Sequence, residues 1–157
     1  MYSKTQMDNI LELHRGYDLP ERDRRDGSVP IISSSGYSGV HNAAKCSGEN
    51  VITGRYGTIG EVFYHNGDCW PLNTALYVSD FKNNYPMYIY YLLKHVLKIA
   101  VDGKDKSTVP GVDRNVLHQM NVPFCSDISD QRKIVLLLET IDKKIASNHA
   151  INDNLAA

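Results

Sequence analysis

The chain has almost no excess charge of either sign. Its 157 residues carry 17 Lys and Arg side chains against 18 Asp and Glu side chains, which gives a net charge of −1. A protein that binds nucleic acid on its own and regardless of sequence is normally strongly basic. The composition excludes that class, so any contact with DNA would need a local patch or the help of a partner.

Cysteine is scarce, and Cys46, Cys69 and Cys125 are odd in number and far apart. The sequence contains no Cys-x-x-Cys pair, and its six histidines show no ligand spacing, so we expect no metal site. Reduced thiols are the expected state. The chain also lacks an apolar signal core and any run near the roughly 18 apolar residues of a membrane span. We therefore expect a soluble, cytoplasmic protein without membrane contact.

Motifs of known catalytic sites are also missing. Gly54, Gly57 and Gly60 recur at a three-residue spacing, but the Gly-Lys-Ser/Thr ending of a phosphate-binding loop is absent. No Gly-x-Ser-x-Gly elbow occurs. Asp80 and Asp102, with a lysine two residues on, faintly resemble a metal-dependent nuclease, a pattern that arises often by chance in loops. We expect no catalytic residues and no cofactor.

Short runs of β-branched and aromatic residues, separated by glycine-rich joints, predict a strand-rich domain. The predicted strands cover residues 29–32, 51–53, 59–64, 74–78 and 121–124. We expect residues 1–15 to form a short helix that runs into a strand. Pro86 is well placed to begin a helix that reaches about residue 99, and residues 114–120 form a turn or short helix. The predicted fold class is α+β.

The segment from Gln131 to Leu155 differs in kind from the rest of the chain. Its apolar residues follow a 4-3-4 spacing that two asparagines continue: Ile134, Leu138, Ile141, Ile145, Asn148, Asn152 and Leu155. We call these seven positions the seam. A helix about 38 Å long with so narrow an apolar seam is typical of a coiled-coil strand. The alternative is a helix packed back on its own domain, which would leave the asparagine amides unpaired.

Five short motifs occur in a fixed order along the chain. They are Val29–Gly36, Gly54–Gly60, Trp70–Thr74, Val109–Val112 with Arg114, and Gln131 at the start of the long helix. In this order and spacing they resemble the specificity subunit of type I restriction–modification systems, over about Leu11 to Leu155. Each motif alone is weak, whereas the ordered set is specific.

This resemblance implies a target recognition domain over residues 1–126 and a conserved spacer helix over residues 127–157. In that family one recognition domain reads one half of a split DNA sequence, and a full subunit looks like two such units with antiparallel helices. The chain would be a half-subunit, a truncation, or a recognition domain excised from a fused restriction–modification enzyme. Its implied partners are double-stranded DNA, the methyltransferase subunits and, through them, the endonuclease subunit, and it would carry no chemistry itself. A non-catalytic coiled-coil scaffold protein is the alternative.

Four polar loops could supply the DNA contacts, because base edges are read by side chains that enter a groove while phosphate contacts fix position. Their candidate residues are Arg22, Arg24, Arg25, Ser35, Tyr37, His41, Arg55, Tyr56, Lys104, Lys106, Ser107 and Arg114. The two lysines and Ser107 suit phosphate. The first three arginines could equally lie in a solvated loop, Arg55 could pair with Glu61 or bond turn carbonyls, and a packed Tyr37 is favoured over a stacking one.

The unpaired seam predicts self-association. We expect the chain to form a homodimer through the long helix, and thereby to present two recognition domains to a two-fold symmetric, bipartite DNA site.

Overall fold

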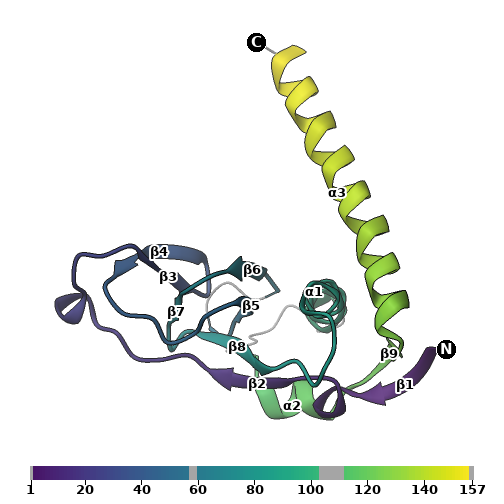
Figure 1. The fold of residues 1–157 in the computed structure, drawn as a ribbon, viewed down its shortest axis with the longest axis horizontal. Helices are drawn as coiled ribbons and strands as arrows, with labels where there is room; N and C mark the ends of the chain where they lie inside the picture. Colours follow the sequence, from purple (N-terminus) through teal and green to yellow (C-terminus); the bar gives the residue numbers. More distant parts are fainter. Residues whose placement is uncertain (1, 57–59, 103–111, 156–157) are drawn as a thin grey trace.

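The computed structural model of the chain describes residues 2–56, 60–102 and 112–155. A strand-rich domain is followed by a long C-terminal helix, so the α+β prediction is confirmed (Figure 1). Within the described residues, none of the helices combines the length and the apolar character that crossing a bilayer would need.

The strands form three small sheets. The largest is antiparallel and has the order β2 (Glu12–Arg15), β8 (Ala75–Asp80), β5 (Glu49–Gly54) and β6 (Val62–Asn66). The second joins β4 (Gly36–His41) to β3 (Val29–Ser33), which pairs in parallel with β7 (Trp70–Pro71). The third pairs β1 (Tyr2–Gln6) with β9 (Asn121–Cys125).

Three α-helices complete the fold: α1 (Pro86–Asp102), α2 (Arg114–Gln119) and α3 (Ile128–Leu155). Two short 3-10 turns, Met7–Asn9 and Glu21–Asp23, lie in the first part of the chain. The largest apolar cluster forms where α1 packs on β5 and β6, and it includes Ile89, Leu93 and Leu97. A second cluster, with Ile32, Ile52 and Tyr77, joins the two larger sheets.

Residues 1–15 do not begin with a helix, and that prediction is wrong. β1 pairs with β9 more than a hundred residues later, and a 3-10 turn separates it from β2. The apolar residues of the expected helix, Met7, Ile10, Leu11 and Leu13, are all fully buried. The spacing of these residues correctly indicates which side chains are buried. A tight turn followed by a strand buries the same residues as a helix would, and the local sequence gives no sign that β1 pairs with the distant β9.

Other boundaries shift by a few residues. β6 begins at Val62; of the predicted strand over residues 59–64, residue 59 lies outside the described residues, and residues 60 and 61 precede the strand. α1 extends to Asp102. α3 begins at Ile128 because the Asp127 carboxylate accepts the backbone N–H of Asp130 at 3.0 Å, which caps the helix.

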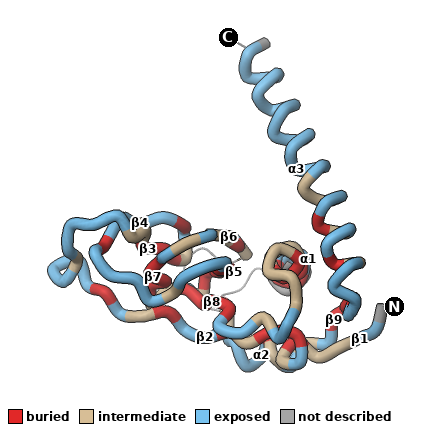
Figure 2. Tube along the Cα trace, viewed as in Figure 1, coloured by how far each residue is buried: buried red, intermediate tan, exposed pale blue. Residues whose placement is uncertain are grey.

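The first turns of α3 belong to the domain core, and the remainder does not. Gln131 and Val135 are buried, whereas from Thr140 to Asn154 every residue is exposed. Figure 2 shows this change along the helix as it leaves the domain. The boundary between the two predicted domains at residues 126 and 127 stays a prediction.

Candidate nucleic-acid interface

Three arginines from distant parts of the chain surround one hollow of about 600 Å³. Arg15 ends β2, Arg55 follows β5, and Arg114 opens α2. We call this site the arginine hollow. Its remaining lining residues are Tyr56, Leu76, Val112, Asp113 and Asn115.

A close backbone crossing brings Arg15 to this place. Gly16 passes directly over Pro71 and Leu72, and a Cβ atom at residue 16 would lie 2.2 Å from the carbonyl oxygen of Leu72. Two hydrogen bonds hold the crossing: the Gly16 N–H donates to Ala75 at 3.0 Å, and the Tyr17 N–H donates to Pro71 at 2.8 Å. Glycine is required here because any side chain would collide with backbone.

Arg55 is fixed by backbone bonds on both sides. Its N–H donates to the carbonyl of Thr74 at 2.8 Å, and its own carbonyl accepts the N–H of Val112 at 2.8 Å. Its guanidinium lies 4.5 Å from the centre of the Tyr56 ring, a cation–π contact that orients the side chain. No ion pair between Arg55 and Glu61 is present among the described residues.

Arg15 is oriented by a carboxylate. Its guanidinium lies 3.2 Å from Asp18, whose carboxylate also accepts the side-chain amide of Asn73. Arg114 is exposed at the start of α2, where the preceding Asp113 caps the helix by accepting the N–H of Asn115 at 2.8 Å. Exposed arginines remain charged at any physiological pH and can accept new partners at little cost.

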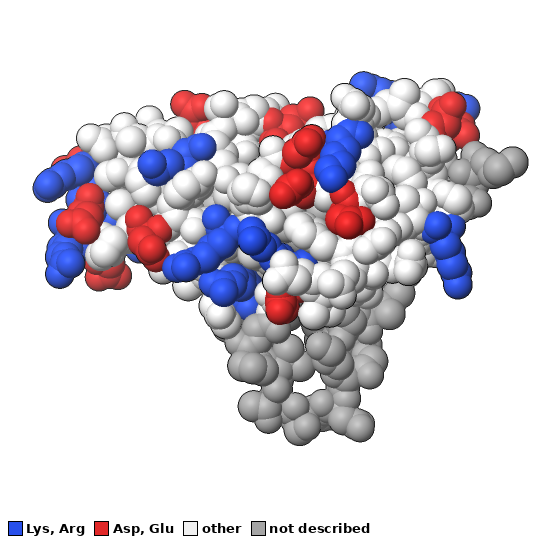
Figure 3. Space-filling model, turned by 90° about the horizontal axis from the view of Figure 1, so that it is seen from below, with Lys and Arg blue, Asp and Glu red and all other residues white. Residues whose placement is uncertain are grey.

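The site therefore joins three of the sequence motifs and a local excess of positive charge. Arg55 belongs to the motif Gly54–Gly60, Thr74 to the motif Trp70–Thr74, and Val112 with Arg114 to the motif that follows. β2 and α2 lie on the underside of the molecule in Figure 1, and the view of that side shows a group of Lys and Arg side chains near the middle of the surface (Figure 3).

The model of one protein family, the type I restriction modification DNA specificity domain, matches residues 2–157. The chain belongs to this family. No curated protein matches it by sequence.

Solved specificity subunits share the fold. A type I restriction-modification S subunit from M. genitalium is 19% identical, with a TM-score of 0.76, over 98% of this chain and 44% of that one. The HsdS subunit from Thermoanaerobacter tengcongensis is 13% identical, with a TM-score of 0.70, over 93% of this chain and 38% of that one. A structure on complex assembly of the type I R-M system is also 13% identical, with a TM-score of 0.73, over 93% and 39%. This specificity domain thus spans less than half the length of each solved chain.

The predicted DNA contacts fall into two described groups. Arg55, Tyr56 and Arg114 line the arginine hollow. The others lie on the sheet of β3, β4 and β7 or in the segments that lead into it, a region we call the distal end: Arg22, Arg24, Arg25, Ser35, Tyr37 and His41. Lys104, Lys106 and Ser107 lie outside the described residues, and Val112, the first described residue after them, lines the arginine hollow.

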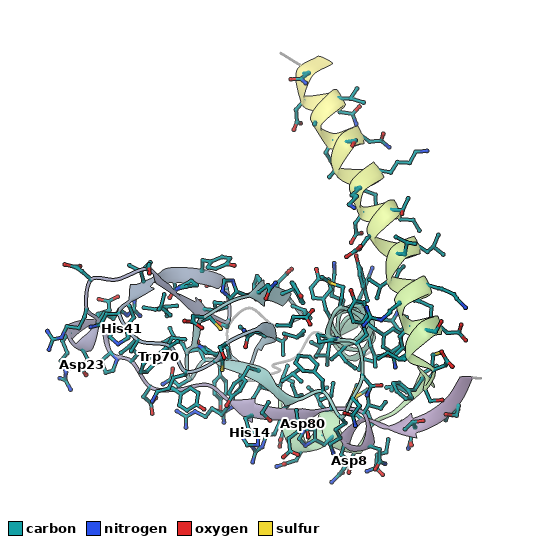
Figure 4. The ribbon with its side chains drawn as sticks, viewed as in Figure 1. Asp8, His14, Asp23, His41, Trp70 and Asp80 are labelled. Atoms are coloured by element: carbon teal, nitrogen blue, oxygen red, sulfur yellow. The ribbon has the colours of Figure 1, made fainter. Side chains whose placement is uncertain are left out.

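His41 is a structural residue of the distal end, which corrects the prediction. Its ring is buried, its Nδ1 accepts the backbone N–H of Arg25 at 3.0 Å, and it packs edge-on against Trp70 at 5.0 Å. Figure 4 shows His41 and Trp70 together at that end, far from α3. A ring so enclosed cannot reach a base edge.

Two further distal residues differ from expectation in opposite ways. Arg24 is half-buried and donates to the carbonyl of Ser38 at 2.9 Å, so part of its guanidinium is used within the domain. Tyr37 is 65% exposed, and the expectation of a packed ring is wrong; its hydroxyl bonds Nδ1 of His65 at 3.0 Å. Arg22, Arg25 and Ser35 are exposed.

The sequence search missed Arg15. No local motif marks it, because its place in the hollow depends on the pairing of β2 with β8, which sets Arg15 opposite Leu76. Asp80, considered for a nuclease, ends β8 and accepts the N–H of Lys82 at 2.7 Å. The side chain of Asp102 lies outside the described residues.

The seam divides into two parts. Ile134 and Leu138 are half-buried at the base of α3, whereas Ile141, Ile145, Asn148 and Asn152 are exposed. The side chain of Leu155 lies outside the described residues. Leu137 and Ile151, exposed by 62% and 55%, were not predicted and extend the apolar side of the helix.

Proposed function

We propose that the arginine hollow forms part of the surface with which this specificity domain reads one half of a bipartite DNA sequence. One observation carries this proposal: three family motifs, far apart in the chain, meet around three arginines on a chain whose net charge is −1. Affinity for DNA comes largely from phosphate contacts, and sequence discrimination from side chains that reach base edges.

The arginines differ in how they are held, and this difference suggests different roles. Arg55 is fixed by backbone bonds and by the Tyr56 ring, so its planar fork is preorganised to meet the O6 and N7 acceptors of a guanine. Arg15 pairs with Asp18 at the surface and can exchange that carboxylate for a phosphate. Lys104, Lys106 and Ser107, which precede Val112 in the chain, are assigned to phosphate contacts.

The exposed residues of the distal end, Arg22, Arg25, Ser35 and Tyr37, form a second candidate contact region. A duplex with a groove about 12 Å wide can accept side chains from more than one loop. We rank the arginine hollow above the distal end as a DNA-contact region, because hydrogen bonds between residues of the family motifs fix the backbone around it.

In the assembled system the chain supplies recognition and no chemistry. Methyltransferase subunits dock on it, and the endonuclease subunit joins through them, as implied for the family. The exposed part of the seam, with Ile151 beside it, supports a homodimer through α3, because covering Ile141, Ile145 and Ile151 removes apolar surface from water. The dimer presents two recognition domains to a two-fold symmetric site.

The decisive experiment measures DNA binding by the chain reconstituted with methyltransferase subunits of its own restriction–modification system. Sequencing of the methylated motif in cells supplies the duplex, and fluorescence anisotropy supplies the affinity. Arg55→Gln and Arg114→Gln should each weaken binding by about 5- to 150-fold, because a base contact by arginine contributes about 1–3 kcal/mol.

Lys133→Gln is the matched control. It removes the same charge from α3, where the exposed Lys133 pairs with the half-buried Asp130 at 2.9 Å, and it should change affinity by less than about fivefold, since such pairs contribute little. Arg55→Lys distinguishes a base contact from a phosphate contact, because lysine keeps the positive charge but lacks the paired N–H donors of the guanidinium. Equal affinities for the parent and both glutamine variants would remove the arginine hollow from the interface.

A further inference from the structure

Cys46 and Cys69 lie directly opposite each other across a short antiparallel bridge. The N–H of Cys46 donates to the carbonyl of Cys69 at 3.0 Å, and the N–H of Cys69 donates back at 2.9 Å. Residues paired in this way have Cα atoms about 5.5 Å apart. That separation falls within the range of about 4.4–6.8 Å that a disulfide bond requires.

The two thiols also differ in exposure. Cys69 is fully buried, whereas Cys46 is half-buried and lines an open hollow of about 540 Å³ together with Lys45, Ser47 and Glu49. A reagent in solution therefore reaches the Cys46 thiol first. The Cys69 thiol is shielded from solvent and lies beside Cys46.

The backbone pairing brings the two side chains to neighbouring positions, and their different surroundings assign a role to each residue. The side-chain hydrogen bond between them lowers the pKa of Cys46 below its ordinary value and raises the pKa of Cys69. The thiolate is the reactive form of cysteine, so the more accessible thiol is also the better nucleophile.

We propose that Cys46 and Cys69 form a peroxide-responsive thiol pair that closes to an intramolecular disulfide. The Cys46 thiol first loses its proton; the thiolate then attacks the terminal oxygen of a hydroperoxide and breaks the O–O bond. Cys46 becomes a sulfenic acid, and the leaving hydroxide (or alkoxide) takes up the proton that Cys46 released and departs as water (or an alcohol). The Cys69 thiol then attacks the sulfenic sulfur, the S–S bond forms, and the hydroxyl leaves as water with the Cys69 proton. Two thiols are oxidised by two electrons, and one peroxide is reduced.

The new bond would join two segments that flank the aromatic contacts of the distal end. Lys45, next to Cys46, lies over the rings of Tyr17 and Trp70 at 5.2 and 5.0 Å, and Trp70 is next to Cys69. A disulfide here closes a loop of about two dozen residues, so the melting temperature of the oxidised chain should rise by roughly 5 °C or more.

The test begins with the parent chain. It is treated with a limiting amount of hydrogen peroxide, alkylated with N-ethylmaleimide in denaturant, and analysed by intact mass and peptide mapping. The reduced chain should take up three alkyl groups, one for each cysteine. The oxidised chain should take up one, at Cys125, and yield a peptide pair joined through Cys46 and Cys69.

Variants separate this bond from unspecific oxidation. Cys125→Ser removes the third thiol, which is buried, and this variant should still form the bond, whereas Cys46→Ser and Cys69→Ser should not. Mapping of the parent chain answers the question even where a variant fails to fold. Oxidation that stops at added oxygen on Cys46, a bond that includes Cys125, or a bond between two chains would overturn the assignment.

Discussion

Gln131 is the residue that fixes the long helix to the domain. Its side chain is fully buried, and its amide makes three hydrogen bonds. The nitrogen donates to the side chain of Asn84 at 2.7 Å and to the carbonyl of Cys125 at 2.9 Å, and the oxygen accepts the N–H of Tyr85 at 2.8 Å. One amide thus joins the start of α1, the end of β9 and the first turn of α3.

Replacing this amide should cost much of the stability of the domain. Gln131→Leu keeps the volume but removes the hydrogen bonds to the Tyr85 N–H, the Asn84 side chain and the Cys125 carbonyl, so unfolding in urea should show a loss of about 2–5 kcal/mol. Gln119→Leu is the control, because Gln119 is exposed on α2 and should change stability by no more than about 0.5 kcal/mol. Equal midpoints and slopes for the two variants would contradict this role.

His118 links the stability of the domain to pH. Its Nε2 accepts the backbone N–H of Leu13 at 3.0 Å, so this nitrogen must be free of a proton. Burial lowers the pKa of His118 below its ordinary value; nearby Arg114 and Lys82 also lower it, while Glu12 and Asp8 raise it. The lowered pKa means that the folded chain resists a proton that the unfolded chain accepts.

Acid should therefore destabilise the parent more than a variant without this imidazole. As the pH falls below about 6.5, the unfolded state binds the proton first, and stability falls until the pH has passed the folded pKa. His118→Gln keeps an acceptor and does not titrate, so its urea midpoint should fall less over that window. His149→Gln, at an exposed position on α3, should follow the parent; parallel curves for His118→Gln and the parent would exclude the linkage.

Among single residues, the sequence predicted those candidate site residues that belong to recognisable motifs. Arg55 and Arg114 were named from their motifs, and both line the arginine hollow. Arg15 and Gly16 were not, since their place follows from a crossing with residues 71–75 that no local pattern encodes. His41 was predicted to contact DNA because it follows a polar loop, and the local sequence does not show that its ring packs against Trp70 in the folded domain.

The long helix α3 exposes a row of apolar side chains. Its predicted seam runs from half-buried residues at the base to exposed ones beyond Ile141, and Leu137 and Ile151 widen it. The first turns of α3 pack on the domain, and farther along the helix the exposed Asp142 accepts a hydrogen bond from the Tyr91 hydroxyl of α1 at 2.8 Å. The helix is therefore only partly packed back on its own domain, and pairing with a second helix stays a prediction. Leu136, which is 67% exposed, lies on the opposite side of the helix from Ile141 and Ile145. It precedes them by five and nine positions, which correspond to rotations of about 140° and 180° around the helix axis.

That opposition supplies a matched pair of substitutions. Ile141→Asp with Ile145→Asp should weaken self-association by more than about tenfold, because a charge buried in a helix pair has no partner. Leu136→Asp changes a residue of greater exposure on the other side and should leave the association constant near that of the parent. Sedimentation equilibrium measures both, and a parent chain that is monomeric at tens of micromolar would rule out pairing through α3.

Elements with a strong local signal were predicted well, and those that depend on distant partners were not. α1 and α3 follow from periodicity, and β3 and β9 from short apolar runs. β1 carries a polar sequence, Tyr-Ser-Lys-Thr-Gln, and is a strand only because β9 pairs with it. β7 has two residues and owes its pairing to β3.

For the whole molecule, near-neutral charge makes salt dependence an informative measurement. If Lys104 and Lys106 contact phosphates, replacing both with alanine should lower the slope of log affinity against log salt by up to about 1.8, since each phosphate contact contributes about 0.9. Lys143→Ala with Lys144→Ala removes the same charge from the exposed part of α3 and should leave the slope unchanged. Titrations of the reconstituted methyltransferase complex between about 50 and 200 mM salt give the slopes. An unaltered slope in the first variant would place those lysines outside the footprint.

Trp70 gives the molecule an internal optical probe. It is the single tryptophan of the chain, it is buried at the distal end against His41 and Tyr17, and Lys45 lies over its ring. Its fluorescence therefore reports on the sheet of β3, β4 and β7, whereas far-ultraviolet circular dichroism is dominated by α1 and α3. Recording both signals during one denaturation shows whether the distal end and the helical half unfold together, and the same emission can report DNA contact at that end without any added label.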